Sequence, residues 1–167
     1  MTNTRVMVDM SVTLIHHGHI RLLKKAAKHG CVVVGLTSDD EVLANKGFQP
    51  ELSFNERKEI IDAIDCVAEV VEVPWLVDES ILNKFNIDIL IHGHDNSNLI
   101  PQNKLKLLPR TSGVSSSQLR NHAVRSITQI NNQKLMLTPG PAVILHENII
   151  NLKPIFGRGD NEYTVMS

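Results

Sequence analysis

The sequence predicts an α/β fold, in which a doubly wound, Rossmann-like and mostly parallel sheet of five strands carries helices on both faces. Three observations support this prediction. Short runs rich in β-branched residues, such as CVVVGL at residues 31–36, suit strands that are covered on both faces. Segments with helical spacing of their apolar residues alternate with these runs. The chain has 167 residues, which is enough for one well-buried α/β domain and a short appendage.

Each expected element is bounded by cap or turn signals. The strands are expected at residues 6–10, 31–36, 67–73, 89–91 and 105–108. Ser38 is a good N-cap for a helix over residues 39–44, and Ser53 with Glu56 forms the capping box of a helix that runs to about Ile64. Further helices are expected at residues 18–27, at residues 79–85 and after the loop that starts at Pro109.

Composition limits the partners of the chain. Seventeen Lys and Arg stand against 18 Asp and Glu, so there is no general basic field for nucleic acid or for an anionic membrane, and any phosphate must be bound locally. No stretch has the length and apolar character of a signal peptide or a membrane span. We therefore expect a cytoplasmic protein, with Cys31 and Cys66 as buried free thiols.

Three loops are expected to meet at one edge of the sheet, because parallel strands end there with the same polarity. They cover residues 11–19, 92–96 and 110–117, and they carry imidazoles, a carboxylate, a guanidinium and hydroxyls. A helix that starts at or just after Gly18 aims unpaired N–H groups at the first loop, which makes that loop a ready anion site. The imidazoles of this loop are equally compatible with a metal-binding loop or a merely polar one. No G-x-G-x-x-G or G-x-x-x-x-G-K-[ST] motif occurs, which argues against a dinucleotide enzyme and a P-loop NTPase.

Two motifs resemble those of a known superfamily. HHGH at residues 16–19 resembles the signature of the HxGH nucleotidyltransferases, and RTSGVSSS at residues 110–117 resembles the RTxGISTT motif of cytidylyltransferases related to glycerol-3-phosphate cytidylyltransferase. The likeness extends over roughly residues 5–124. It implies that His16 and His19 hold the α- and β-phosphates of CTP, that Lys46 reaches the phosphate chain, and that Arg110 contacts the β- and γ-phosphates.

The resemblance further implies a set of binding residues. His16, His19, Lys46 and Arg110 are the expected catalytic residues. The expected nucleotide-binding residues are Val8, Met10, Ser11, His16, His19, Lys46, His92, Gly93, Asp95, Arg110, Thr111, Val114, Ser115 and Ser116. Magnesium is expected to accompany CTP, with Asp95 as its candidate protein ligand. Trp75 falls where this family often has a tryptophan, although packing explains it equally well.

The chain departs from the family pattern in two places. The family's Gly-Thr-Phe-Asp is MSVT at residues 10–13, so the carboxylate before the histidines is missing, and its Gly-Asp-Asp-Trp is GHDN at residues 93–96. The stretch MSVTLIH at residues 10–16 resembles instead the MSADLIH version of nucleotidyltransferase domains associated with phosphonate biosynthesis. This likeness implies a phosphonate acceptor.

The end of the chain differs in character. Residues 128–133 are polar without a helical or strand period, so residues 127–134 are predicted to be a linker after a transferase domain at residues 1–126. LTPGP at residues 137–141 and FGRGD at residues 156–160 resemble the start of a 2-aminoethylphosphonate transaminase, although proline and glycine alone indicate only a surface tail. Residues 135–167 would then be the incomplete opening of a covalently fused transaminase domain, without a pyridoxal phosphate site in this segment.

Taken together, the residues and the resemblance predict an enzyme that transfers CMP from CTP to 2-aminoethylphosphonate and releases pyrophosphate. One alternative is a cytidylyltransferase for phosphocholine or glycerol 3-phosphate, and another is a non-catalytic nucleotide or metal sensor. We expect a homo-oligomer, in the form of a dimer.

Overall fold

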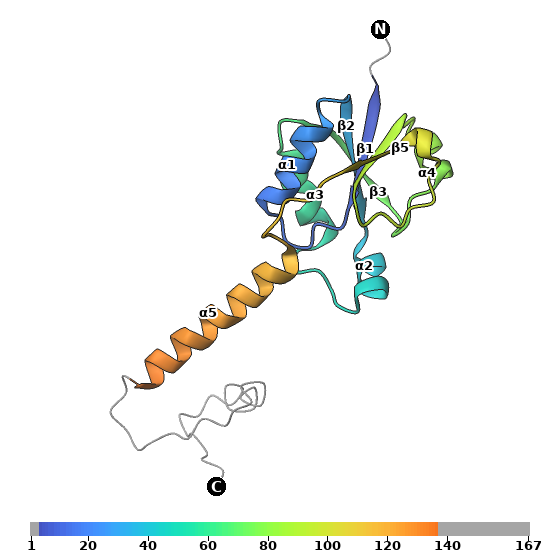
Figure 1. The fold of residues 1–167 in the computed structure, drawn as a ribbon. Helices are drawn as coiled ribbons and strands as arrows, with labels where there is room; N and C mark the ends of the chain where they lie inside the picture. The colour runs from blue at the N-terminus through green and yellow to red at the C-terminus, as the bar shows by residue number, and fades with distance from the viewer. Residues whose placement is uncertain (1–3, 137–167) are drawn as a thin grey trace. The chain divides into compact units, whose positions relative to one another are not determined.

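The computed structural model describes residues 4–136, with side chains described as far as residue 130, and it contains a five-stranded parallel sheet (Figure 1). The strands are β1 (Arg5–Met10), β2 (Cys31–Thr37), β3 (Val67–Val73), β4 (Ile89–Gly93) and β5 (Leu105–Leu108). They lie in the order β3-β2-β1-β4-β5, and every neighbouring pair is parallel. The predicted strands and the α/β fold class are confirmed.

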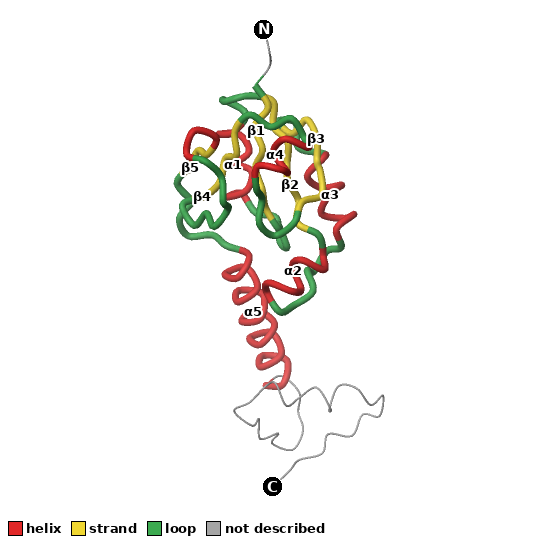
Figure 2. Tube along the Cα trace, turned by 90° about the vertical axis from the view of Figure 1, so that its right-hand side faces the viewer, coloured by secondary structure: helices red, strands yellow, loops and turns green. Residues whose placement is uncertain are grey.

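Helices cover both faces of the sheet (Figures 1 and 2). They are α1 (His17–Ala26), α2 (Asp39–Lys46), α3 (Phe54–Asp62), α4 (Glu79–Lys84) and α5 (Ser116–Met136), with a 3-10 turn at Gln102–Lys104. Leu23 of α1 and Ile61 of α3 pack with Val8 and Val34 on one face. Leu82 of α4 packs with other residues of the sheet in a second core on the opposite face. The doubly wound prediction is therefore confirmed.

The predicted caps are also present. The Ser38 hydroxyl accepts a hydrogen bond from the Glu41 N–H, and α2 ends at Gly47, whose φ of 74° lies in the left-handed region that suits glycine. Ser53 and Glu56 form the predicted capping box of α3. These local signals fix where the two helices begin and end.

The strand order reverses at β1, and this reversal positions the site. From β1 the chain moves outward to β2 and β3, and it later returns to the other side of β1 with β4 and β5. The connections after β1 and β4 therefore diverge over opposite faces of the sheet, which leaves a crevice at the carboxyl ends of these strands.

The prediction for the end of the transferase domain needs correction. Residues 128–133 are not an irregular linker, because α5 continues through them to Met136. A helix that buries one face shows apolar residues at helical spacing in its sequence. This part of α5 lacks that pattern, and its apolar side chains Val124, Ile127 and Ile130 are 63%, 58% and 61% exposed. The chain separates into two units after Asn121, inside α5. The LTPGP and FGRGD segments lie outside the described residues, so the transaminase-like opening stays a prediction.

The cysteines differ from the prediction in burial. Cys31 and Cys66 are free thiols, but each is only partly buried. Cys31 opens β2 at the amino end of the sheet, and Cys66 immediately precedes β3, so neither lies at the covered centre of a strand. No helix among residues 4–136 is long and apolar enough to cross a membrane.

One buried charge holds the carboxyl ends of β1 and β2 together. The Arg57 side chain is 1% exposed, and its Nη1 donates hydrogen bonds to the Ser11 carbonyl at 2.6 Å and to the Thr37 carbonyl at 3.0 Å. Its Nη2 also forms an ion pair with Asp39 at 2.6 Å. A single guanidinium thus satisfies carbonyls from two loops that both leave the sheet at this edge.

Replacing Arg57 by Met should destabilise the domain strongly. The change leaves the Ser11 and Thr37 carbonyls without their donor, and each buried unsatisfied group costs about 1–3 kcal/mol. We expect a loss of at least ~3 kcal/mol in the free energy of unfolding, measured by urea denaturation. Lys58→Met on the same helix is the control, because its exposed ion pair with Asp62 contributes at most about 0.5 kcal/mol. Equal losses in the two variants would contradict this role of Arg57.

Candidate active site

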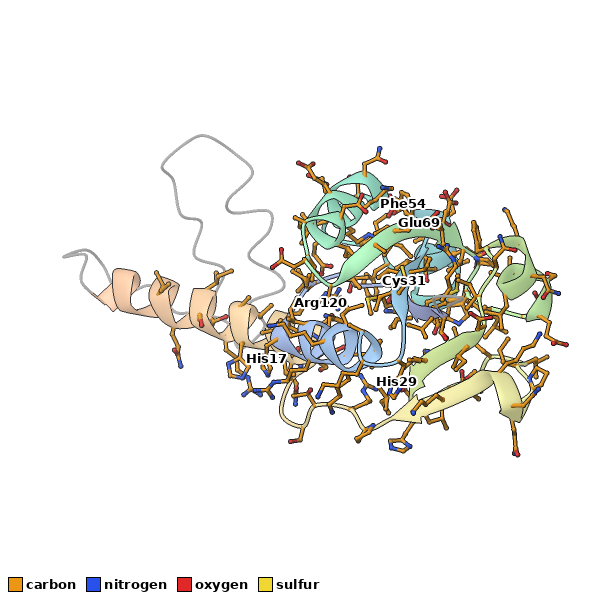
Figure 3. The ribbon with its side chains drawn as sticks, turned by 90° about the horizontal axis from the view of Figure 1, so that it is seen from above. His17, His29, Cys31, Phe54, Glu69 and Arg120 are labelled. Carbon is orange, nitrogen blue, oxygen red and sulfur yellow. The ribbon has the colours of Figure 1, made fainter. Side chains whose placement is uncertain are left out.

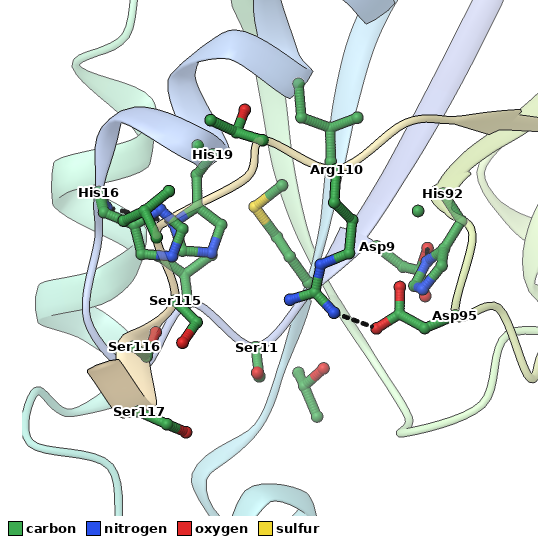
Figure 4. A pocket seen from close by; sticks show the side chains of 18 of the residues that line it. Asp9, Ser11, His16, His19, His92, Asp95, Arg110, Ser115, Ser116 and Ser117 are labelled. Carbon is green, nitrogen blue, oxygen red and sulfur yellow. Dashed lines mark hydrogen bonds and ion pairs between the residues drawn. The ribbon is translucent and has the colours of Figure 1, made fainter. Parts of the chain in front are cut away.

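A cavity of about 620 Å³ opens at the carboxyl edge of the sheet, which is a typical volume for a small-ligand site (Figure 4). The three predicted loops all contribute to its wall. Figure 4 shows the two histidines and the serines of α5 on one side, Asp9, His92 and Asp95 on the other, and Arg110 between them. The predicted convergence of the loops is confirmed.

His16 and His19 are arranged by the first turn of α1. His16 is the N-cap residue, and its backbone N–H donates a hydrogen bond to Nδ1 of His19 at 3.2 Å. The two rings stack with their centroids 3.8 Å apart. Because Nδ1 of His19 accepts, the neutral ring carries its proton on Nε2 and can donate it to a ligand oxygen. Nδ1 of His16 is buried without a partner among the described residues, as is common where a ligand completes a site.

Both histidines are held neutral. Burial lowers the pKa of His19 to about 3, and the charges of His16, Arg110 and Lys46 act in the same direction. Burial also lowers the pKa of His16, with His17 and Arg110 contributing. The neutral rings can act as hydrogen-bond donors. They also add no positive charge beside Lys46 and Arg110.

The remaining positions of the HHGH motif have distinct roles. The His17 side chain is exposed and does not line the cavity (Figure 3). A Cβ on Gly18 would lie 2.9 Å from Cε1 and Nδ1 of the His16 ring, which is closer than side chains tolerate. Gly18 therefore allows the His16 ring to lie against the backbone of α1, and this explains the glycine between the two histidines.

Lys46 and Arg110 are the predicted phosphate-binding cations, and both line the cavity. Nζ of Lys46 donates to Oγ of Ser11 at 2.6 Å and lies 5.5 Å from the centroid of the Trp75 ring. Burial lowers the pKa of Lys46, and the charges of Arg120 and Arg57 lower it further. Nη1 of Arg110 forms an ion pair with Asp95 at 2.6 Å.

The serines before and within the first turn of α5 join this helix to the first loop. Oγ of Ser115 accepts a hydrogen bond from the Gln118 N–H at 3.1 Å, which makes Ser115 a capping residue. Oγ of Ser116 donates to the Leu14 carbonyl at 3.1 Å. The amino end of α5, with its unpaired N–H groups, is thereby fixed against the loop that carries the histidines.

A buried polar network on the opposite side of the cavity escapes sequence-based prediction. Oδ1 of Asp9 lies 2.6 Å from Nδ1 of His92, and Oδ2 of Asp9 accepts from the Asn98 amide at 2.8 Å. Asn98 in turn accepts from the Val77 N–H at 2.7 Å. Burial lowers the pKa of His92, but its hydrogen bond to Asp9 and the Asp9 charge outweigh burial and leave this pKa raised. In the sequence, the one local indication of this network is the carboxylate of Asp9 near the end of a buried strand.

The predicted site residues are brought together with one exception. Of the predicted binding residues, Met10, Ser11, His16, His19, Lys46, His92, Gly93, Asp95, Arg110, Thr111, Val114, Ser115 and Ser116 line the cavity. Val8 does not, because its side chain is completely buried in the core beneath α1 and α3. Among the side chains of residues 4–130, no group of three His, Cys, Asp or Glu is placed to hold a metal ion.

The protonation state of His19 provides a test of this geometry. Its pKa in the folded protein, about 3, lies below the ordinary value of 6.5, so this group favours folding fully above pH 6.5 and loses that contribution as the pH falls toward 3. In ¹H–¹⁵N NMR spectra of the ligand-free protein, we expect His19 to remain a neutral Nε2–H tautomer down to pH 5. A His19 ring that becomes charged above pH 5 would show that the stacked pair is misplaced.

The comparisons with known proteins concern the family and the fold of the chain. Residues 13–118 match the family model described as cytidylyltransferase-like. An ethanolamine-phosphate cytidylyltransferase from Arabidopsis thaliana is 33% identical over 132 residues, which cover 69% of this chain and 31% of the relative. A glycerol-3-phosphate cytidylyltransferase from Bacillus spizizenii is 35% identical over 122 residues, which cover 70% of this chain and 94% of the relative.

The chain spans about a third of the length of the ethanolamine-phosphate relatives from Arabidopsis thaliana and Dictyostelium discoideum. The crystal structure of the lipopolysaccharide core biosynthesis protein from Thermoplasma volcanium GSS1 superposes with a TM-score of 0.56 at 21% identity, over 66% of this chain and 99% of that one. At this identity the likeness concerns the fold alone. The match to the family model and the identity to the curated relatives establish that this chain belongs to the cytidylyltransferase-like family.

Proposed function

We propose that this chain transfers CMP from CTP to 2-aminoethylphosphonate and releases pyrophosphate. The observation that carries the proposal is the division of the cavity into two chemically different sides. Groups suited to phosphate, namely His16, His19 and the amino end of α5, lie on one side. The other side holds the carboxylate of Asp9, which is fixed by two hydrogen bonds and is suited to an ammonium group.

We assign the triphosphate to the residues of the first side, together with Lys46 and Arg110. His16 and His19 would donate to the α- and β-phosphates, and Lys46 would contact the phosphate chain. Arg110, Ser115 and Ser116 would bind the β- and γ-phosphates at the amino end of α5. Charge-assisted contacts of this kind gain strength as negative charge moves toward the departing pyrophosphate.

The reaction needs little covalent help from the protein. An oxygen of the phosphonate attacks the α-phosphorus and forms a new P–O bond, while the bond from the α-phosphorus to the oxygen shared with the β-phosphate breaks. A phosphonate dianion is already nucleophilic, so no general base is required. The contribution of the residues is to align the two substrates and to stabilise charge on the phosphate oxygens.

Magnesium is the expected companion of CTP. Asp95 is the one carboxylate on the cavity wall beside Arg110, and its Oδ2 is held by that arginine at 2.6 Å. Its other oxygen fits the usual way in which magnesium binds to nucleotide enzymes, through one or two carboxylates together with substrate phosphates. The ion would neutralise charge on the phosphate chain.

Asp9 is the group that we assign to the acceptor's ammonium. It lines the cavity, and each of its carboxylate oxygens keeps a lone pair beyond its present hydrogen bond. Trp75 also lines the cavity, but its ring already has Nζ of Lys46 at 5.5 Å from its centroid. Phosphoethanolamine and 2-aminoethylphosphonate share an ammonium and a phosphorus oxyanion and differ by one bridging oxygen. The likeness of residues 10–16 to the MSADLIH sequence, and the transaminase-like tail, favour the phosphonate.

The proposal can be tested by pyrophosphate release from CTP and magnesium. We expect kcat/KM to be highest with 2-aminoethylphosphonate, when it is compared with phosphoethanolamine, phosphocholine and glycerol 3-phosphate. A preference for phosphoethanolamine would preserve the amine site and reject the phosphonate. A preference for glycerol 3-phosphate would reject both assignments. Absence of pyrophosphate release with every acceptor would favour a sensor.

Asp9→Asn isolates the amine contact within the same assay. The change keeps the size of the side chain but removes its charge, and a hydrogen bond to a charged group contributes about 1.5–3 kcal/mol. We therefore expect kcat/KM for 2-aminoethylphosphonate to fall roughly 10- to 100-fold. Ethylphosphonate, which lacks the amine, should react equally well with the variant and the parent.

The HHGH motif supplies an internal comparison for the phosphate contacts. His16→Ala and Lys46→Ala should each lower kcat about 100- to 1000-fold, because each removes a donor to an oxygen that gains charge in the transition state. Thermal unfolding should change little in both variants. His17→Ala should remain within a few-fold of the parent, since His17 is exposed outside the cavity. Equal damage from His16→Ala and His17→Ala would show that the phosphates bind elsewhere.

A further inference from the structure

Asn98, in the connection between β4 and β5, is a buried polar residue of the cavity wall to which no sequence motif assigns a role. Its side chain joins two distant parts of the chain, namely Asp9 near the end of β1 and Val77 in the connection between β3 and α4. The residue is 8% exposed, and its backbone N–H donates to Oδ1 of Asn96 at 3.2 Å. A buried side chain with both ends satisfied holds its neighbours in one arrangement.

The partners of Asn98 fix the orientation of its amide. The backbone N–H of Val77 can only donate, so the atom that it contacts at 2.7 Å is the carbonyl oxygen of the Asn98 side chain. The NH₂ group therefore faces Asp9 and donates to its Oδ2 at 2.8 Å. Nδ1 of His92 lies 2.6 Å from Oδ1, the other oxygen of Asp9 (Figure 4). A proton on Oδ2 would meet the amide hydrogens, so Asn98 holds this oxygen as a hydrogen-bond acceptor.

The carboxylate of Asp9 can be reached only through a small opening, because the residue is 9% exposed. A primary ammonium carries N–H groups that can donate directly to such an oxygen. A quaternary ammonium has no N–H group, and its methyl groups keep its charge at a distance. It can therefore neither donate to Asp9 nor approach it closely.

Proteins that recognise quaternary ammonium groups surround them with aromatic rings instead. Among the described residues that line the cavity, Phe48 and Trp75 are the only Phe, Tyr or Trp side chains. Each ring already has a cation of the protein beside it. The Arg120 guanidinium lies 4.6 Å from the centroid of the Phe48 ring, and Nζ of Lys46 lies 5.5 Å from the centroid of the Trp75 ring. The described part of the cavity wall therefore offers no set of unoccupied rings for a quaternary ammonium.

We propose that Asn98 is a positioning residue that holds Asp9 as a hydrogen-bond acceptor, and that the site thereby selects a primary ammonium over a quaternary one. This inference rests on the proposed function, because it concerns the amine of the substrate that receives CMP. It assigns the selectivity to directional hydrogen bonds, since charge alone would attract both kinds of ammonium. The substrate class is then a small phosphorus oxyanion that carries a primary amine.

Pyrophosphate release from CTP and magnesium with three matched phosphonates tests the selectivity. The phosphonates are 2-aminoethylphosphonate, its N,N,N-trimethyl analogue, and ethylphosphonate, which has no amine. For the parent, we expect kcat/KM to be about 10- to 100-fold higher with the primary amine than with the trimethyl analogue, which is the range for a hydrogen bond to a charged group. Equal values for the two amines, both above that for ethylphosphonate, would show that charge alone attracts the amine and would overturn the selectivity.

Asn98→Ala tests the positioning role. The change removes the donor to Asp9, so kcat/KM for 2-aminoethylphosphonate should fall about 3- to 10-fold. The values for the trimethyl analogue and for ethylphosphonate should change less than about two-fold, because neither substrate donates a hydrogen bond to Asp9. Asn98→Ala should have no further effect when Asp9 is already Asn, since the two residues then act through the same contact.

A control and a substitute variant accompany this test. Leu99→Ala is the matched control, because Leu99 follows Asn98 in the same connection, is 83% exposed and is not part of the cavity wall. It should leave all three kcat/KM values unchanged. If Asn98→Ala does not fold, Asn98→Ser gives the same comparison, since its hydroxyl ends one bond short of the amide atoms that reach Asp9 and Val77.

The outcomes separate this inference from the proposed function. If Asn98→Ala lowers kcat/KM for all three phosphonates alike, its role is structural and the positioning role is overturned. A rise for the trimethyl analogue, without a fall for 2-aminoethylphosphonate, would show that the volume of Asn98 excludes the methyl groups, and it would overturn the positioning role as well. The transferase proposal stands in both cases. A parent that releases no pyrophosphate with 2-aminoethylphosphonate would overturn the proposed function together with this inference.

Discussion

The buried guanidinium of Arg57 is the interaction on which the geometry of the site depends. It binds the carbonyls of Ser11 and Thr37, which follow β1 and β2, and the carbonyl of Leu52 from the connection after α2. Three chain segments are thereby fixed at the carboxyl edge of the sheet. Lys46 reaches Ser11 only because the loop after β1 is held in this position. Burial of the Arg57 charge costs desolvation free energy. In return, the guanidinium supplies hydrogen bonds to backbone carbonyls that lie beyond the ends of the strands and have no partner in the sheet.

The cavity concentrates positive charge, and the structure limits the resulting repulsion. Arg110 is paired with Asp95 and Arg120 with Glu51, while His16 and His19 stay neutral. Lys46 remains without a carboxylate partner among the described residues and has a lowered pKa. The charged side chains are therefore already oriented before a ligand binds. Such preorganisation is the condition under which charged groups stabilise negative charge on phosphate oxygens effectively.

Much of the fold could be predicted because the signals are local. The β-branched runs identify β2 and β3, and Ser38 and Ser53 mark the starts of α2 and α3. The exposed part of α5 was missed, because a helix that buries no face needs no apolar period. Val8 was assigned to the nucleotide, whereas strand geometry directs its side chain into the core.

The limits of prediction at the site follow from sequence separation. The histidine and serine motifs are contiguous, so their chemistry is visible in the sequence. The network of Asp9, His92 and Asn98 joins residues 83 and 89 positions apart, and Arg120 meets Thr13 across 107 positions. No local pattern indicates such pairs, since they exist only after β4 and α5 have come together with β1 and the loop that follows it.

This separation has a consequence for the order in which the protein acquires its site during synthesis. Within this sheet, β1 is the first strand to be synthesised and becomes the central strand, and its pairing is complete only when β4 has been added. The cavity cannot close until the start of α5 has also emerged, because Ser116 anchors the loop at Leu14. Under the proposed function, a nucleotide would therefore find no partly formed site on the growing chain. It would bind only the finished domain, and by linkage it would stabilise that domain as a whole, by about 2.7 kcal/mol at a ligand concentration one hundred times its Kd.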